Sequence, residues 1–151
     1  FEDIYSDDSR ERDFKHKIYG SDAGFYAAQV AQKNIQSAGL QRDIEVRQVR
    51  VQELKAEDGK LGGCNVDGAL VMINPPYGER LEDKATLPGI YSQFGESFKM
   101  LDSWSAYMIT SYEDAEKYIG RKADKNRKIY NGMMKTYLYQ FMGPRPPKGN
   151  K

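Results

Sequence analysis

The residues best suited to chemistry are Asn74, Pro75, Pro76 and Tyr77, which directly follow an apolar segment. The Asn74 amide and the next residue's carbonyl offer two acceptors for an exocyclic amino group on a purine or pyrimidine. Tyr77 can stack on the base, and the two prolines restrict where its neighbours point. The set suits aiming an amino lone pair at an electrophile, although a Pro-Pro pair by itself is also typical of a structural turn.

The composition excludes several other kinds of chemistry. One Cys and one His (Cys64 and His16) exclude a disulfide within the chain and a Cys-based zinc site, and we assign no role to either residue and no metal to the site. The 23 basic and 22 acidic residues nearly cancel, so nucleic-acid binding would require a local patch. No apolar run reaches membrane-spanning length and no signal pattern opens the chain, so we expect a cytoplasmic protein without a membrane partner.

The segment before the loop predicts how the loop is positioned. Residues 66–73 end in an uninterrupted apolar run, which predicts a central strand buried on both faces. The strand should end at Asn74, because the prolines that follow cannot donate to a sheet. Ligands of open α/β sheets bind at the carboxyl ends of strands, where this loop would lie.

The remaining elements alternate between strands and helices. Strands are expected at 16–22, 44–51, 105–110 and 136–141, helices at 23–38, 87–101 and after a capping box at 111–114, and turns at 55–65. Asn131 and Gly132 predict a hairpin turn before the last strand. The fold class is therefore α/β, with a mostly parallel sheet, helices on both faces and a C-terminal antiparallel hairpin.

Side-chain spacing also predicts the core. Tyr91, Phe94 and Phe98 recur at helical spacing, and Trp104 opens a strand, so all four are expected in the core. The length predicts one domain, divided into a polar lead-in at 1–15, a main body at 16–143 and a basic, Pro-rich tail at 144–151.

The sequence Asn-Pro-Pro-Tyr-Gly-Glu-Arg-Leu at 74–81 resembles a known enzyme family. This is the S-adenosylmethionine-dependent family of large-subunit ribosomal RNA guanine-N2 methyltransferases, also catalogued as N6-adenine-specific DNA methylases. The likeness extends over 17–143, including 19–22, 31–34, 38–39 and 128–132. It implies a Rossmann-like class I methyltransferase fold, with S-adenosylmethionine as cofactor and ribosomal RNA as substrate.

The resemblance implies roles for the loop. Asn74 and Pro75 would accept hydrogen bonds from the guanine amino group, and Tyr77 would stack on a base flipped into the site. Methyl transfer would be a direct displacement that depends on orientation, with neither a metal nor a covalent enzyme intermediate. Glu79 and Arg80 would contact RNA phosphate or form a solvated ion pair.

The resemblance also implies cofactor contacts. Asp22 would bind the ribose hydroxyls, and an N-cap role at the following helix is compatible with this. The family places an acidic residue after its third strand to meet the cofactor adenine. Arg50 stands at that position, and Gln52 or Glu53 could substitute for the acidic residue.

One family feature is missing, because no glycine-rich cofactor loop occurs within the 151 residues. We expect the first strand and this loop before residue 1, together with an RNA-binding domain, and we expect the fragment alone to be inactive. The adenine-N6 position of DNA or RNA is the alternative target, and a non-catalytic RNA-binding module is the alternative class. The basic residues before the hairpin would be a solvated face or an RNA-backbone contact: Arg121, Lys122, Lys125, Arg127 and Lys128.

Overall fold

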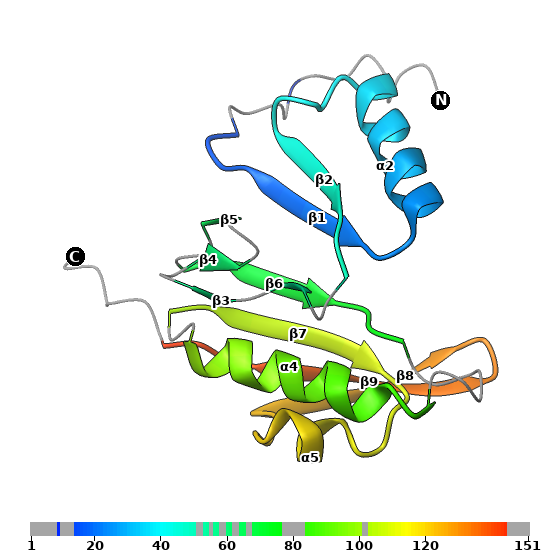
Figure 1. Cartoon of the computed structure of the whole chain (residues 1–151), viewed down its shortest axis with the longest axis vertical. Helices are drawn as coiled ribbons and strands as arrows, with labels where there is room; N and C mark the ends of the chain where they lie inside the picture. Colours follow the sequence, from blue (N-terminus) through cyan, green and yellow to red (C-terminus); the bar gives the residue numbers. More distant parts are fainter. Residues whose placement is uncertain are drawn as a thin grey trace. The chain divides into compact units, whose positions relative to one another are not determined.

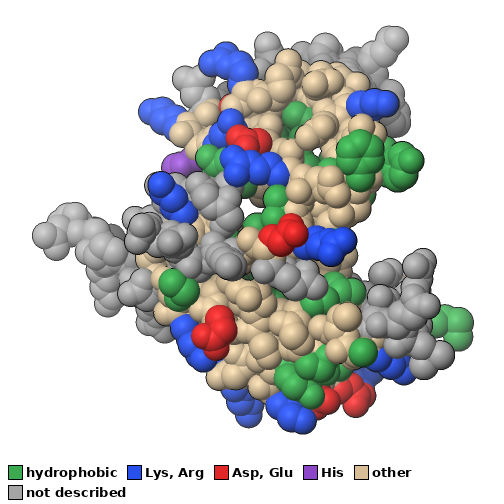
Figure 2. All heavy atoms as spheres, in the orientation of Figure 1, with side chains coloured by type: hydrophobic (Ala, Val, Ile, Leu, Met, Phe, Trp, Pro, Cys, Tyr) green, Lys and Arg blue, Asp and Glu red, His purple; other side chains and the backbone are tan. Residues whose placement is uncertain are grey.

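The computed structural model describes residues 9, 14–50, 53–54, 56–57, 60–61, 64–65, 68–76, 84–100 and 103–144. Its chain divides into two compact units, 1–49 and 50–151 (Figure 1). Charged side chains of both signs are interspersed on the face that Figure 2 shows. Within the described ranges no helix is long and apolar enough to span a membrane.

Unit 1 is a strand–helix–strand arrangement. Strand β1 (Ile18–Asp22) pairs in parallel with β2 (Ile44–Gln48), and helix α2 (Phe25–Ser37) connects them. The predicted strand at 44–51 is therefore shorter than expected. Helical spacing predicts an apolar face made of Ala27, Val30, Ala31, Ile35 and Ala38. That prediction is largely wrong, because Val30 is 56% exposed, Ala31 and Ile35 are only partly buried, and the buried residue is Ala28. Two strands form a narrow sheet, so a helix packs against them along a narrow line.

Residues 55–65 contain more regular structure than the predicted turns. Three two-residue strands, β3 (Ala56–Glu57), β4 (Lys60–Leu61) and β5 (Cys64–Asn65), form an antiparallel sheet in the order β3-β4-β5. Strands of this length carry too few residues for any alternation of apolar and polar side chains to be visible in the sequence.

Unit 2 contains a four-stranded mixed sheet in the order β6-β7-β9-β8. Strand β6 (Leu70–Ile73) runs parallel to β7 (Ser105–Thr110), and β9 (Met134–Phe141) runs antiparallel to β7. Strand β8 (Lys125–Asn131) closes the predicted hairpin with β9. The antiparallel C-terminal hairpin is thus confirmed, and its two-residue loop is Gly132 and Met133, with Gly132 at φ +62°.

The expected burial of the strand before the loop on both faces is wrong. Val71 and Ile73 pack against the core, whereas Leu70 is 60% and Met72 76% exposed. Among the described residues of unit 2, strand β6 ends the sheet, and the two helices of this unit pack on the face that carries Val71 and Ile73. The apolar run therefore shows that a strand is present, but its burial depends on tertiary neighbours.

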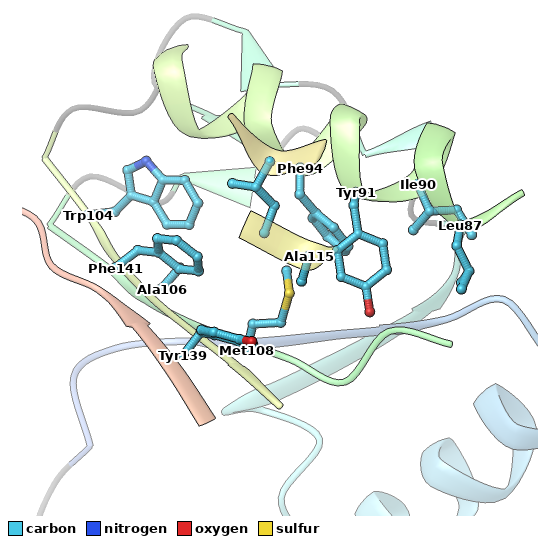
Figure 3. Close-up of a cluster of buried hydrophobic side chains, with 11 residues drawn as sticks. Leu87, Ile90, Tyr91, Phe94, Trp104, Ala106, Met108, Ala115, Tyr139 and Phe141 are labelled. Atoms are coloured by element: carbon cyan, nitrogen blue, oxygen red, sulfur yellow. The ribbon is translucent and has the colours of Figure 1, made fainter. Parts of the chain in front are cut away.

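Helices α4 (Leu87–Met100) and α5 (Ala115–Ile119) form the core with one face of this sheet. The predicted spacing is confirmed, since Tyr91, Phe94 and Trp104 are buried and Phe98 is partly buried. Figure 3 shows Tyr91 and Phe94 on the side of α4 that faces Met108 and Phe141 of the sheet. Phe98 contacts Trp104 edge-on, with 4.7 Å between ring centroids.

The predicted capping box before α5 is wrong. Asp114 is the N-cap and makes no side-chain capping bond, while the predicted cap, Ser111, lies outside the helix. The backbone N–H of Tyr112 donates instead to the Thr110 hydroxyl oxygen at 3.0 Å. This bond pairs a backbone N–H of the turn before α5, and it is not one of the two bonds between Ser111 and Asp114 that a capping box would make. Gly120 ends the helix at φ +71°, in the left-handed conformation that favours glycine.

Gly95 sets the approach of α4 to α5. A β-carbon added there would overlap the backbone carbonyl of Ile119. We expect Gly95→Ala to lower the free energy of unfolding by about 1–3 kcal/mol, because backbone atoms cannot yield as a flexible side chain would. Chemical unfolding of the complete protein followed by circular dichroism measures this change.

Gly89→Ala is the matched control in the same helix. A β-carbon at Gly89 would meet nothing within 4 Å. Alanine there should leave stability unchanged or raise it by up to about 1 kcal/mol. Equal effects of the two substitutions would contradict the role assigned to Gly95.

Candidate functional site

The loop residues Asn74, Pro75 and Pro76 lie where the sequence predicted, directly after β6. Asn74 and Pro76 are exposed, and Pro75 is buried. Strand β6 runs parallel to β7 with Ile73 opposite Met108, so both strands end at the same edge of the sheet. The loop therefore occupies the carboxyl edge, where open α/β sheets bind ligands.

A buried hydrogen-bond network holds the backbone of this loop. The Tyr91 hydroxyl donates to the Pro76 carbonyl at 3.3 Å and lies 2.5 Å from the Thr110 hydroxyl. Because Tyr91 has a single hydroxyl hydrogen, the Thr110 hydroxyl is the donor in the second bond. The Tyr112 N–H completes the network by donating to Thr110. The side chains of Tyr91 and Thr110 have no exposed surface.

Aromatic side chains surround this network. The ring centroids of Tyr91 and Tyr112 lie 4.9 Å apart. Tyr112 also stacks on Tyr118, with an angle of 12° between the ring planes. Partial burial raises the pKa of Tyr112 above its usual value, and the neighbouring Tyr118 and Asp114 add to the effect. The Tyr112 side chain is therefore neutral at physiological pH and adds no charge beside the network. The contribution of the network to the site is positional.

The helical spacing of Tyr91 predicts a core position but does not reveal its contact with the loop. Its spacing with Leu87 and Phe94 predicts packing, and that prediction is confirmed. The available signal was chemical, since a tyrosine on an apolar stripe must find a partner for its hydroxyl. Thr110 at the end of a buried strand carries the same signal.

Asp22 lies at the end of β1 in unit 1. One carboxylate oxygen accepts the Gly24 N–H at 2.6 Å, which fixes the turn into α2. The N-cap of α2 is Gly24, so the expected N-cap role of Asp22 is wrong. Asp22 instead accepts a hydrogen bond from the backbone N–H of the N-cap residue itself. The carboxylate is exposed, and its cofactor role stays a prediction.

Glu53 forms a local turn with Arg50. Its carboxylate accepts the Arg50 N–H at 3.1 Å, and its own N–H donates to the Arg50 carbonyl at 2.9 Å. Four of the predicted site residues lie outside the described residues: Gln52, Tyr77, Glu79 and Arg80. Their assigned roles stay predictions.

The basic residues before the hairpin do not form one patch. Arg121 pairs with Asp124 at 3.0 Å, and this aspartate also accepts the Met142 N–H. On β8, Lys125 and Arg127 alternate with Lys128, so they lie on opposite faces of the strand. A nucleic acid lying along one face of β8 would therefore contact only part of this basic set.

Comparisons with known proteins identify the class. The model of a family described as an RMKL-like methyltransferase domain matches residues 5–140. "Putative RNA methyltransferase YpsC" of Bacillus subtilis is 37% identical over 134 residues, which are 89% of this chain and 33% of that protein. "Ribosomal RNA large subunit methyltransferase K/L" of Hydrogenovibrio crunogenus is 36% identical, covering 82% of this chain and 16% of that protein.

Two solved structures agree with the fold. "SMU.472, a putative methyltransferase complexed with SAH" superposes with a TM-score of 0.79 at 36% identity, covering 95% of this chain and 36% of that one. A "predicted N6-adenine-specific DNA methylase" of Listeria monocytogenes gives a TM-score of 0.68 at 38% identity, covering 84% of this chain and 30% of that one.

The fold and these matches define a Rossmann-like α/β methyltransferase domain, as the loop sequence predicted. More particularly, the chain belongs to the RMKL-like methyltransferase domain family, whose members use S-adenosylmethionine. It spans about a third or less of the curated relatives named above.

We expect Tyr91→Phe to lower the free energy of unfolding by about 1–3 kcal/mol, because it leaves the buried Thr110 hydroxyl without its acceptor as well as the Pro76 carbonyl without its donor. Urea unfolding of the complete protein measures this. Tyr107→Phe on β7 is the control. Among the described residues, the Tyr107 hydroxyl makes one hydrogen bond, an exposed 3.9 Å contact with the Met142 sulfur. A loss as large in the control would contradict a specific role for Tyr91.

Proposed function

We propose that this chain is the catalytic portion of an enzyme that methylates the exocyclic N2 of a guanine in large-subunit ribosomal RNA, using S-adenosylmethionine. The main support is the Asn74-Pro75-Pro76 loop at the carboxyl edge of the sheet, with the Pro76 carbonyl bonded to Tyr91. The Hydrogenovibrio relative, named a ribosomal RNA large subunit methyltransferase, supports the substrate class. Because that substrate is ribosomal RNA, we also propose a cytoplasmic location.

The loop residues act by holding the amino group. The Pro76 carbonyl already accepts the Tyr91 hydroxyl, which leaves the Pro75 carbonyl as the backbone acceptor that we assign to the substrate. The Asn74 side-chain oxygen is the second acceptor. Two acceptors hold both amino hydrogens, so the nitrogen lone pair points away from the loop toward the methyl donor. Tyr77 is proposed to stack on the flipped base, and Glu79 and Arg80 to contact flanking RNA.

The residues present suit the ribose end of the cofactor. Asp22 keeps one carboxylate oxygen on Gly24, and an exposed carboxylate at the end of a strand suits a diol. Gln52 and Glu53 are proposed for the adenine end. The bound cofactor supplies an electrophilic methyl group on a sulfonium. We propose that the rest of the protein carries the glycine-rich loop and an RNA-binding domain, since the relatives are much longer than this chain.

The second candidate is methylation of adenine N6. The Listeria neighbour is named for that activity, and the same two acceptors can hold an adenine amino group. The substrate test uses the full-length protein with tritiated S-adenosylmethionine and either undermethylated ribosomal RNA or DNA. Labelled N2-methylguanine in the large-subunit RNA is the expected product. Label in DNA alone would contradict the proposal, and absence of cofactor binding would favour a non-catalytic RNA-binding module.

Asn74→Ala should lower kcat for methyl transfer at least about a hundredfold, because the amino group loses one of its two positioning acceptors. Cofactor affinity measured by calorimetry should stay nearly unchanged, since Asn74 is assigned to the acceptor substrate. Asn34→Ala, at an exposed position on α2, is the control and should retain full activity. Full activity of Asn74→Ala would show that this side chain does not hold the amino group.

A further inference from the structure

One face of the β8–β9 hairpin carries an alternating pattern of lysine and tyrosine. Lys128 lies opposite Tyr137, and Tyr130 lies opposite Lys135, so all four side chains share one face. The Lys128 ammonium lies 5.1 Å from the Tyr130 ring centroid, and the Lys135 ammonium lies 5.1 Å from the Tyr137 ring centroid. We call these four residues the Lys–Tyr face.

The two tyrosines of this face have different surroundings. Tyr137 packs against the hydrophobic core, which fixes the root of the hairpin, whereas Tyr130 is 62% exposed near the tip. An exposed ring anchored by a rigid hairpin can stack on a planar ligand at little entropic cost. Tyr130 therefore provides a stacking surface, and Tyr137 provides its support.

The electrostatics of the Lys–Tyr face favour an anion. A hydrogen bond to Tyr137 and the charge interaction with that ring raise the pKa of Lys135, with smaller effects of Tyr130 and Glu113. Lys128, through a hydrogen bond and its charge, lowers the pKa of Tyr130. Glu113 is the acidic neighbour identified for Lys135, and the chain as a whole has a net charge of +1. A polyanion would therefore be attracted by a local group of lysines such as this one and not by the charge of the whole chain.

The Lys–Tyr face also lies near the candidate catalytic edge. Tyr137 pairs with Thr110 at the end of β7, and β6 ends beside β7 in the same unit, so the hairpin tip projects from the edge that carries Asn74. Strands lie about 4.8 Å apart, which places β9 about 10 Å and β8 about 14 Å from β6 across the sheet. A single nucleic-acid strand can contact both places at once.

We propose that the Lys–Tyr face binds the single-stranded nucleotides that flank the target base, with Tyr130 stacking on a base and Lys128 and Lys135 contacting phosphates. Stacking on an exposed aromatic beside phosphate-binding lysines is how proteins hold single strands without reading sequence. The identity of this strand as RNA rests on the proposed function.

The test measures binding of a labelled single-stranded oligouridine RNA to the full-length protein by fluorescence anisotropy over a range of salt concentrations. Tyr130→Ala should weaken binding by about 5- to 150-fold without changing the salt dependence. Lys128→Ala with Lys135→Ala should reduce the slope of log K against log salt by about 1.4, which corresponds to two lost phosphate contacts. Tyr130→Phe keeps the ring and should restore wild-type affinity.

Lys117→Ala is the matched control. Lys117 lies 5.2 Å from the Tyr118 ring centroid on α5, so the substitution removes the same kind of contact elsewhere on unit 2. Wild-type affinity is expected for this variant, and an equal loss would overturn the assignment to the hairpin. Thermal unfolding of each variant should match that of the wild type.

The failure of this inference is distinguishable from failure of the proposed function. Wild-type affinity in both hairpin variants, with ribosomal RNA still methylated, would overturn the role of the Lys–Tyr face alone. Loss of RNA affinity in these variants would support the role of the Lys–Tyr face. If the wild-type protein at the same time methylated no nucleic acid, the proposed function would be contradicted. Unchanged RNA binding in the hairpin variants, together with loss of binding to a protein partner, would also overturn the role of the Lys–Tyr face.

Discussion

The hydrogen bond from Tyr91 to the Pro76 carbonyl is the constraint on which the candidate site depends. It joins three segments that are distant in sequence, since Tyr91 lies in α4, Thr110 ends β7 and Pro76 follows β6. Buried hydroxyl groups must be paired, so movement of any one segment would leave a donor or an acceptor unsatisfied. The backbone of the loop is therefore fixed by the core rather than by the loop's own residues.

Packing determines where the Tyr91 hydroxyl lies. Leu87, Ile90 and Phe94 hold α4 on the sheet, and Gly95 allows the backbone of α5 to come close. A change in the distance between the two helices would move α4 across the sheet and carry the Tyr91 hydroxyl away from Pro76. The stability of the core and the geometry of the site are consequently coupled through one helix.

Those parts of the structure that depend on local spacing were predictable from sequence. The apolar stripe of α4 needs only its own 3.6-residue period, and Pro75 ends β6 because it has no N–H to donate. The exposure of Leu70 and Met72 was not predictable, because it depends on which face of the sheet the helices cover. The partner of Tyr91 depends on the same topology, so the sequence indicated a buried tyrosine but could not identify the acceptor of its hydroxyl.

The chemistry explains why a polar pair lies in an otherwise apolar cluster. Replacing both members of a buried hydrogen-bonded pair with apolar groups of similar shape can be nearly neutral for stability, so stability alone does not require Tyr91 and Thr110. Direct methyl transfer needs no covalent step on the protein, and its rate depends on how accurately the amino group is oriented. A hydrogen bond is directional, whereas apolar packing is not, so the pair gives the Pro76 backbone an orientation that an apolar core could not. On the proposed function, the pair contributes mainly by positioning the loop that holds the substrate.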